Sequence, residues 1–181
     1  MNPAAAAPAR RRPRILYLMH VDWRWVKQRP HHLAEGLNGW ADLLVLFRPA
    51  RGRSRLPANP SRVRRWPLLP IPSRSRWLGW LDAPLQRLWV GLAAAWFRPD
   101  LVWVTFPTLA AYLPRRLWHR GVVYDCMDLA EGFGGTPGHL RRVRALEERL
   151  AREARLVLCS SQNLEAGLRA RYPGARPVLV R

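Results

Sequence analysis

Acidic residues are scarce in this chain. Its 181 residues include 12 aspartates and glutamates against 31 arginines and lysines, so the formal net charge is +19. Lys27 is the only lysine, and arginine supplies almost all of the positive charge. A codon bias toward arginine and alanine is expected to account for much of this excess. The remainder favours partners such as anionic membranes, nucleic acid or polyanionic substrates.

Cysteines and long apolar runs are also rare. Cys126 and Cys159 are the only cysteines, and neither has metal-ligand spacing to the other or to a histidine. We therefore predict reduced, buried thiols in a cytosolic protein. Asp82 and Arg87 interrupt the apolar segment 77–97, which argues against a membrane-spanning helix.

The common motifs of nucleotide binding and catalysis are missing. The sequence contains no GxGxxG after an apolar segment, no P-loop, no HExxH and no GxSxG. The glycine-rich segment 132–135 follows an apolar run but lacks the spacing to cradle a pyrophosphate. We interpret it as a flexible loop.

Short apolar segments alternate with segments of helical periodicity along the chain. This alternation predicts an α/β domain with a doubly wound parallel sheet, whose first β-loop-α-β unit is parallel and right-handed. The length suits a single domain. The predicted strands are residues 15–19, 43–47, 63–66, 101–105, 122–125, 156–159 and 177–180.

One predicted helix begins at Pro137, with Thr136 as its N-cap. Another is short and ends at Tyr112, and a third is capped by Ser160 or Ser161. The residues predicted to form the buried stripe of the helix after Pro137 are Leu140, Val143, Leu146 and Leu150.

Two segments depart from this alternation. Residues 1–13 are rich in alanine, proline and arginine and are predicted to be a disordered tail. Residues 48–97 form an insertion that joins an Arg/Pro/Ser-rich part to a Trp-rich part of helical spacing, and its arginines together with Trp77 and Trp80 are typical of a membrane-surface element. Burial of these tryptophans in the core is the alternative.

Candidate functional residues follow the apolar segment 122–124. Asp125 and Asp128 come directly after it, and in open α/β sheets ligands bind outside the carboxyl ends of the strands. These aspartates could act as a general base, orient a sugar hydroxyl, or hold a divalent ion. Alternatively, they are helix caps and loop staples.

A second group lies at the start of the first predicted helix. Arg29, His31 and His32 stand where free backbone N–H groups and the helix dipole favour anions. A phosphate or carboxylate would fit there. The alternative is a solvated cap with Arg29 paired to Asp22.

Four stretches, in this order and spacing, resemble the amino-terminal domain of family 4-like glycosyltransferases. They are residues 23–37, 99–107, 122–128 and 146–164. The first is similar to the WxxxxQRPxHLA segment of the teichuronic-acid-type branch. The resemblance covers nearly the whole chain from Arg14 onward.

The resemblance implies one Rossmann-like half of a retaining, two-domain GT-B enzyme. Such enzymes use a nucleotide sugar as co-substrate and need no metal or other cofactor, and their amino-terminal half shapes the acceptor site. The Gly-Gly turn that many relatives carry after the first strand is replaced here by residues 20–23. The candidate substrate-binding residues are His20, Asp22, Trp23, Arg29, His32, Phe106, Asp125, Asp128, Ser160 and Ser161, with Asp125 and Asp128 also candidates for catalysis.

The resemblance also implies that the nucleotide-sugar-binding half is supplied elsewhere, because residues 177–181 resemble the strand that leads into the interdomain linker. We expect a chain that is inactive alone, as a gene fragment or one partner of a split enzyme. Its acceptor would be a cell-surface polysaccharide or lipid-linked glycan at the cytosolic face of an anionic membrane. The alternative is a non-catalytic membrane-surface or glycan-binding module, and no motif for specific nucleic-acid binding is present.

Overall fold

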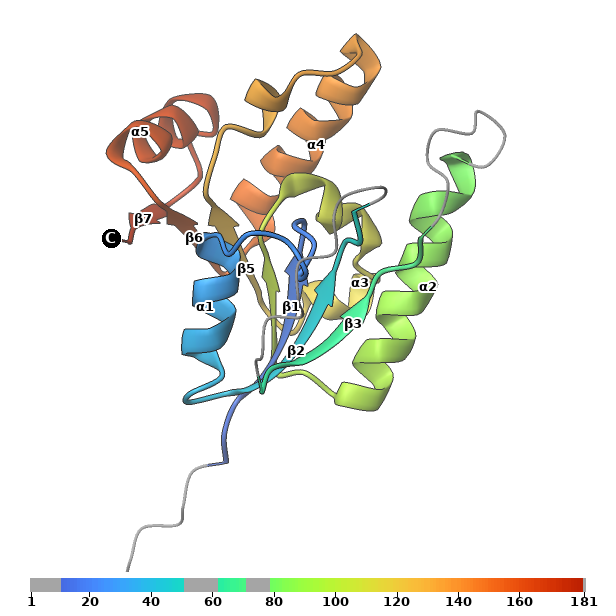
Figure 1. Ribbon diagram of the computed structural model, residues 1–181. Coiled ribbons are helices and arrows are strands. Elements are labelled where there is room, and N and C mark those ends of the chain that lie inside the picture. Colours follow the sequence, from blue (N-terminus) through green and yellow to red (C-terminus); the bar gives the residue numbers. More distant parts are fainter. Residues whose placement is uncertain (1–10, 51–61, 71–78, 181) are drawn as a thin grey trace, which may run out of the picture.

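The computed structural model describes residues 11–50, 62–70 and 79–180. Its centre is a seven-stranded sheet in which all neighbouring strands are parallel, in the order β3-β2-β1-β4-β5-β6-β7 (Figure 1). This is the predicted α/β fold. The strands are β1 (Arg14–Met19), β2 (Asp42–Phe47), β3 (Arg64–Pro67), β4 (Leu101–Val104), β5 (Val122–Cys126), β6 (Leu156–Cys159) and β7 (Pro177–Leu179).

The central strands are apolar on both faces, as strands of a parallel sheet between helices must be. Residues 15–19 of β1 are fully buried, and alternate residues belong to two separate cores. Leu16 and Leu18 face one core, whereas Ile15 and Tyr17 face the other. The first unit, β1–α1–β2, is parallel as predicted, with Ile15 in register with Leu43.

Helices cover the two faces unequally. Among the described residues, α1 is the helix that packs on the face of Ile15 and Tyr17, and α2 to α5 contribute to the opposite core. Figure 1 shows α1 and α2 on opposite sides of β1 to β3. The helices are α1 (Arg29–Leu37), α2 (Gly79–Phe97), α3 (Arg115–Trp118), α4 (Pro137–Glu153) and α5 (Gln162–Arg171), with 3-10 helices η1 (Pro107–Tyr112) and η2 (Ala130–Phe133).

Several predicted boundaries shift. The third strand lies one residue later than predicted, and β5 continues through Asp125 to Cys126. The short helix ending at Tyr112 is a 3-10 helix, and neither α3 nor η2 was expected from the sequence. Most of the predicted tail, and residues 51–61 and 71–78 of the insertion, lie outside the described residues. No helix in the described ranges is long and apolar enough to cross a membrane.

Helix α4 has the predicted cap and nearly the predicted buried stripe. Thr136 accepts a hydrogen bond from the backbone N–H of His139 at 3.3 Å. Val143 and Leu150 are fully buried, whereas Leu140 and Leu146 are only half-buried. The same face buries Glu147, whose carboxylate accepts hydrogen bonds from the hydroxyls of Tyr124 and Tyr172.

Candidate functional site

The strand order places a crevice between β1 and β4. The chain moves from β1 to β2 in one direction and from β4 to β5 in the other, so the carboxyl ends of β1 and β4 flank the topological switch point. Ligands of open α/β sheets bind at such a point. His20 follows β1, and Thr105 and Phe106 follow β4.

His20 is held firmly at this switch point. Its Nδ1 lies 2.9 Å from the Thr105 hydroxyl, which also accepts the backbone N–H of His20 at 3.2 Å. The ring packs on Phe106 with centroids 5.0 Å apart, and Phe106 in turn contacts Phe133. Burial, assisted by the nearby His31, lowers the pKa of His20 to about 4. At neutral pH the imidazole is therefore uncharged.

A cavity of about 560 Å³ opens beside His20, at the carboxyl edge of the sheet. Three separate loops line it, those after β1, β2 and β5. Its polar and aromatic lining includes His20, Asp22, Gln28, Arg48, Asp128 and Phe133.

Asp22 connects the loop after β1 to the loop after β2 through hydrogen bonds. Its carboxylate accepts hydrogen bonds from the backbone N–H of Arg24 at 2.9 Å, from the Arg24 guanidinium, and from the backbone N–H of Ala50 at 2.7 Å. Burial acts to raise the pKa of Asp22, but these hydrogen bonds outweigh it and hold the pKa below its ordinary value. The alternative in which Arg29 pairs with Asp22 is wrong, because Arg24 occupies that carboxylate.

Arg29 instead contacts Asp125. Its guanidinium lies 3.4 Å from Oδ1 of Asp125, which is completely buried, while Arg29 stays partly exposed. Burial raises the pKa of Asp125, and the charge of Arg29 opposes that rise. The pair joins the start of α1 to the end of β5, and neither residue lines the cavity.

Asp128 differs from the other two aspartates. It is exposed and lines the cavity. Among the described residues, no hydrogen bond or ion pair holds its carboxylate. It can therefore accept a hydrogen bond from a ligand hydroxyl, or take a proton from it, without first giving up an internal partner.

The remaining predicted site residues do not line the cavity. Trp23 is buried against the ring of His31, and His32 is exposed on α1. Ser160 donates a hydrogen bond to the carbonyl of Met127 at 2.8 Å, which fixes the loop after β5. Ser161 is the N-cap of α5 and accepts the backbone N–H of Leu164 at 3.3 Å.

Sequence reasoning missed Thr105, Arg48 and Phe133. Thr105 and Arg48 each follow an apolar strand, so the strand-end signal that identified Asp125 applies to them too. Phe133 lies within the glycine-rich segment interpreted as a flexible loop, and it reaches the cavity because η2 turns it back toward Phe106. Within the described ranges, no group of three or more histidine, cysteine, aspartate or glutamate side chains could hold a metal ion.

The pKa of His20 predicts a loss of stability in mild acid. The unfolded chain takes up a proton near pH 6.5, but the folded chain does so only near pH 4. The contribution of the uncharged His20 to the free energy of unfolding is therefore fully present above pH 6.5, and it is lost as the pH falls toward 4. One pKa unit corresponds to about 1.4 kcal/mol, so the whole loss amounts to about 3 kcal/mol.

Urea unfolding at pH 7 and at pH 4.5 measures this loss. The His20→Gln variant should lose less stability between the two pH values than the parent chain. His119→Gln, at an exposed histidine, is the matched control. An unchanged pH dependence in His20→Gln would show that the imidazole is not buried uncharged.

Known structures share this fold. Sucrose-phosphate synthase from Thermosynechococcus elongatus matches with a TM-score of 0.69 at 14% identity, over 94% of this chain and 48% of that chain. A shorter chain of the same synthase matches with a TM-score of 0.57 at 15% identity, over 91% of this chain and 87% of that one. This chain thus spans about half of the longer synthase chain, and its fold is that of one half of a GT-B glycosyltransferase.

The family comparison is more specific. No significant match was found among curated proteins. A model of the glycosyl transferase 4-like domain matches residues 26–181, which include α1, the β4–β5 region and Asp128. The match covers most of the chain, and the chain therefore belongs to the glycosyl transferase 4-like domain family.

Proposed function

We propose that this chain is the acceptor-side half of a glycosyltransferase that transfers a sugar from a nucleotide sugar to a cell-surface polysaccharide or lipid-linked glycan. The observation that carries the proposal is the meeting of His20 and Asp128 in one cavity at the switch point of the sheet. An uncharged imidazole and a carboxylate that has no partner among the described residues suit the hydroxyl groups of a glycan. Family membership supplies the reaction class.

The cavity offers each contact that an acceptor glycan needs. Asp128 accepts a hydrogen bond from the hydroxyl that attacks the donor sugar, and His20 orients a neighbouring hydroxyl through Nε2. The exposed face of Phe133 packs against the apolar face of a sugar ring. Arg48 binds an anionic group of the acceptor, such as a phosphate or carboxylate. Asp22 and Arg29 hold the surrounding loops in place.

The donor sugar belongs to the other half of the enzyme. We infer a retaining reaction without a metal or other cofactor, with the nucleotide sugar as co-substrate on a second domain that faces this cavity. The segment 23–37 favours the teichuronic-acid-type branch of the family. Since lipid-linked acceptors lie at the membrane, we place the protein at the cytosolic membrane face.

The purified chain alone is expected to transfer no sugar above background. Its cavity holds an acceptor, but the described residues include no second Rossmann-like unit for the nucleotide. Isothermal titration calorimetry with common nucleotide sugars should likewise show no micromolar binding. Turnover or micromolar nucleotide-sugar binding by the chain alone would contradict the division of roles.

Adding a nucleotide-sugar-binding half distinguishes the proposal from a non-catalytic module. A split enzyme should recover transfer when the two halves are mixed. A glycan-binding module would bind the glycan and still show no transfer with any donor half, and that result would overturn the proposed function.

A further inference from the structure

Helix α2 is apolar on two opposite sides. Its inner side, which includes Val90 and Phe97, is buried against the sheet. Its outer side remains exposed, with Leu88 61% and Trp96 55% accessible. A helix that is apolar all round is normally covered on every side. We call the residues Leu85, Leu88, Leu92 and Trp96 the α2 outer face.

The α2 outer face carries no charge. The only charged residues of α2 are Asp82 and Arg87. The side chains of both form hydrogen bonds with η1. Asp82 accepts the hydroxyl of Tyr112 at 2.9 Å, and Arg87 donates to the carbonyl of Ala111 at 3.0 Å. The four side chains of the outer face are therefore all apolar and exposed.

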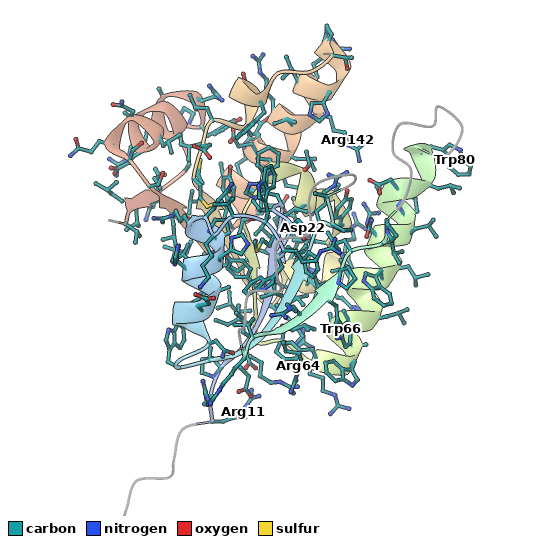
Figure 2. The ribbon with its side chains drawn as sticks, viewed as in Figure 1. Arg11, Asp22, Arg64, Trp66, Trp80 and Arg142 are labelled. Carbon is teal, nitrogen blue, oxygen red and sulfur yellow. The ribbon has the colours of Figure 1, made fainter. Side chains whose placement is uncertain are left out.

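Tryptophans and an arginine border this face. The ring centroids of Trp66 in β3 and Trp96 are 4.8 Å apart. The guanidinium carbon of Arg64 lies 5.4 Å from the centroid of the Trp96 ring. Figure 2 shows Arg64 and Trp66 beside the lower half of α2, with Trp80 at its upper end. Tryptophan and arginine suit a membrane interface, since each combines an apolar body with a polar end.

The exposure of the tryptophans on α2 decides against their predicted alternative, burial in the core. Trp80 is 72% exposed, and Trp96 is also exposed, so core burial is wrong for both residues. Trp77 and the arginines of residues 51–61 and 71–76 lie outside the described residues. The exposed apolar surface is formed by α2 and its neighbours.

A pocket of about 550 Å³ lies where α2 ends, at the amino end of the sheet. Asp100 is the one acidic residue that lines it, and its carboxylate is paired with Arg11 at 2.6 Å. Guanidinium groups in such excess suit a phosphate. The arginines that line this arginine pocket are Arg11, Arg14, Arg98, Arg116 and Arg120.

Arg98 occupies an unusual backbone position in the arginine pocket. Its φ of 50° lies in the left-handed region, at the end of α2, where glycine is the usual residue. Within the described part of the chain, no hydrogen bond or ion pair holds its side chain. The chain thus places a guanidinium at the pocket where a glycine would fit the backbone better.

An apolar groove connects the two features. A cavity of about 410 Å³ between α2 and α3 is lined by apolar residues that include Leu88, Leu92 and Pro114, with Arg87 at its border. Arg116 lines both this groove and the arginine pocket, and it donates to the carbonyl of Gly91 at 2.8 Å. An anionic headgroup with an attached apolar chain matches this arrangement.

We propose that the α2 outer face and the arginine pocket together form the surface by which this protein binds an anionic membrane. Lipid phosphates bind in the arginine pocket, and acyl chains contact Leu88 and Leu92. Asp22 lines the cavity beside His20 and lies toward the opposite end of the sheet from Arg11 (Figure 2), so membrane binding leaves that cavity open. This surface does not depend on the proposed sugar chemistry.

Co-sedimentation of the full chain with lipid vesicles tests the arginine pocket. Vesicles containing phosphatidylglycerol should bind the chain, and pure phosphatidylcholine vesicles should not. Arg98→Gly should weaken binding about fivefold, the effect of one arginine near a charged surface. Its melting temperature should not fall, because glycine relieves the left-handed backbone. Arg142→Ala, at an exposed position of α4, removes one positive charge far from the arginine pocket (Figure 2). It is the charge control and should bind as the parent chain does.

A second pair of variants tests the α2 outer face. The double variant Leu88→Gln/Leu92→Gln should bind anionic vesicles at least fivefold more weakly while remaining folded, and Leu129→Gln, another exposed leucine, should not. Raising the salt should also weaken binding, because charges are screened beyond about 10 Å at 0.1 M. Binding that ignores lipid charge, or is unchanged in the double variant, would overturn the proposal.

A second copy of the chain is the rival occupant of this face. Sedimentation velocity without lipid should show a monomer. A concentration-dependent dimer that Leu88→Gln/Leu92→Gln dissociates would overturn the membrane proposal.

Discussion

Leu150→Ala should lower the free energy of unfolding by about 2 to 5 kcal/mol, the usual cost of truncating a fully buried leucine. Leu150 lies on the inner side of α4, within the core beneath β5 and β6. Its truncation leaves a cavity that the surrounding strands cannot fill. Denaturant titration measures the change.

Two further variants of α4 check the orientation of the helix. Leu146→Ala should cost clearly less than Leu150→Ala, since Leu146 is only half-buried. Arg142→Ala, at an exposed position, should change stability by about 0.5 kcal/mol or less. Equal losses at positions 142 and 150 would mean that the assigned face of α4 is wrong.

The sequence pattern was sufficient for most of this fold because the signals are local. Apolar runs such as residues 156–159 coincide with strands, and the Thr136 and Ser161 caps are recognisable from residue type alone. The half-burial of Leu146 was not predictable, because Glu147 takes the neighbouring buried position. A glutamate is normally exposed, and only the hydroxyls of Tyr124 and Tyr172 make its burial possible.

Asp128→Asn should lower kcat/KM for the acceptor by about 100-fold in an enzyme that contains both halves. The asparagine keeps the shape of the side chain but removes the carboxylate that binds or deprotonates the attacking hydroxyl, and a positioned base contributes at least this much. Stability should not change, because the described residues give the Asp128 carboxylate no internal partner. Initial rates against acceptor concentration measure the effect.

Asp42→Asn is the matched control for this variant. Asp42 is an exposed aspartate at the amino end of β2, at the other edge of the sheet. It should retain the parent kcat/KM. A fall in the melting temperature of Asp128→Asn that parallels the loss of activity would instead indicate a loop staple.

The candidate site was only partly predictable. Strand ends can be read from the sequence, and the end of the predicted strand 122–125 located Asp128. His20 and Phe106 were identified only through the family resemblance. Which of the aspartates remains accessible depends on partners distant in the chain, since Arg29 lies 96 residues from Asp125. The role of Asp22 depends in the same way on the backbone of Ala50, in the loop after β2.

The Michaelis constants for the two substrates test the central claim most directly. In the enzyme with both halves, Asp128→Asn should raise KM for the acceptor at least tenfold, because a hydrogen bond to a charged group contributes about 1.5 to 3 kcal/mol. KM for the nucleotide sugar should stay unchanged. A raised KM for the nucleotide sugar with an unchanged KM for the acceptor would contradict the assignment of this cavity to the acceptor.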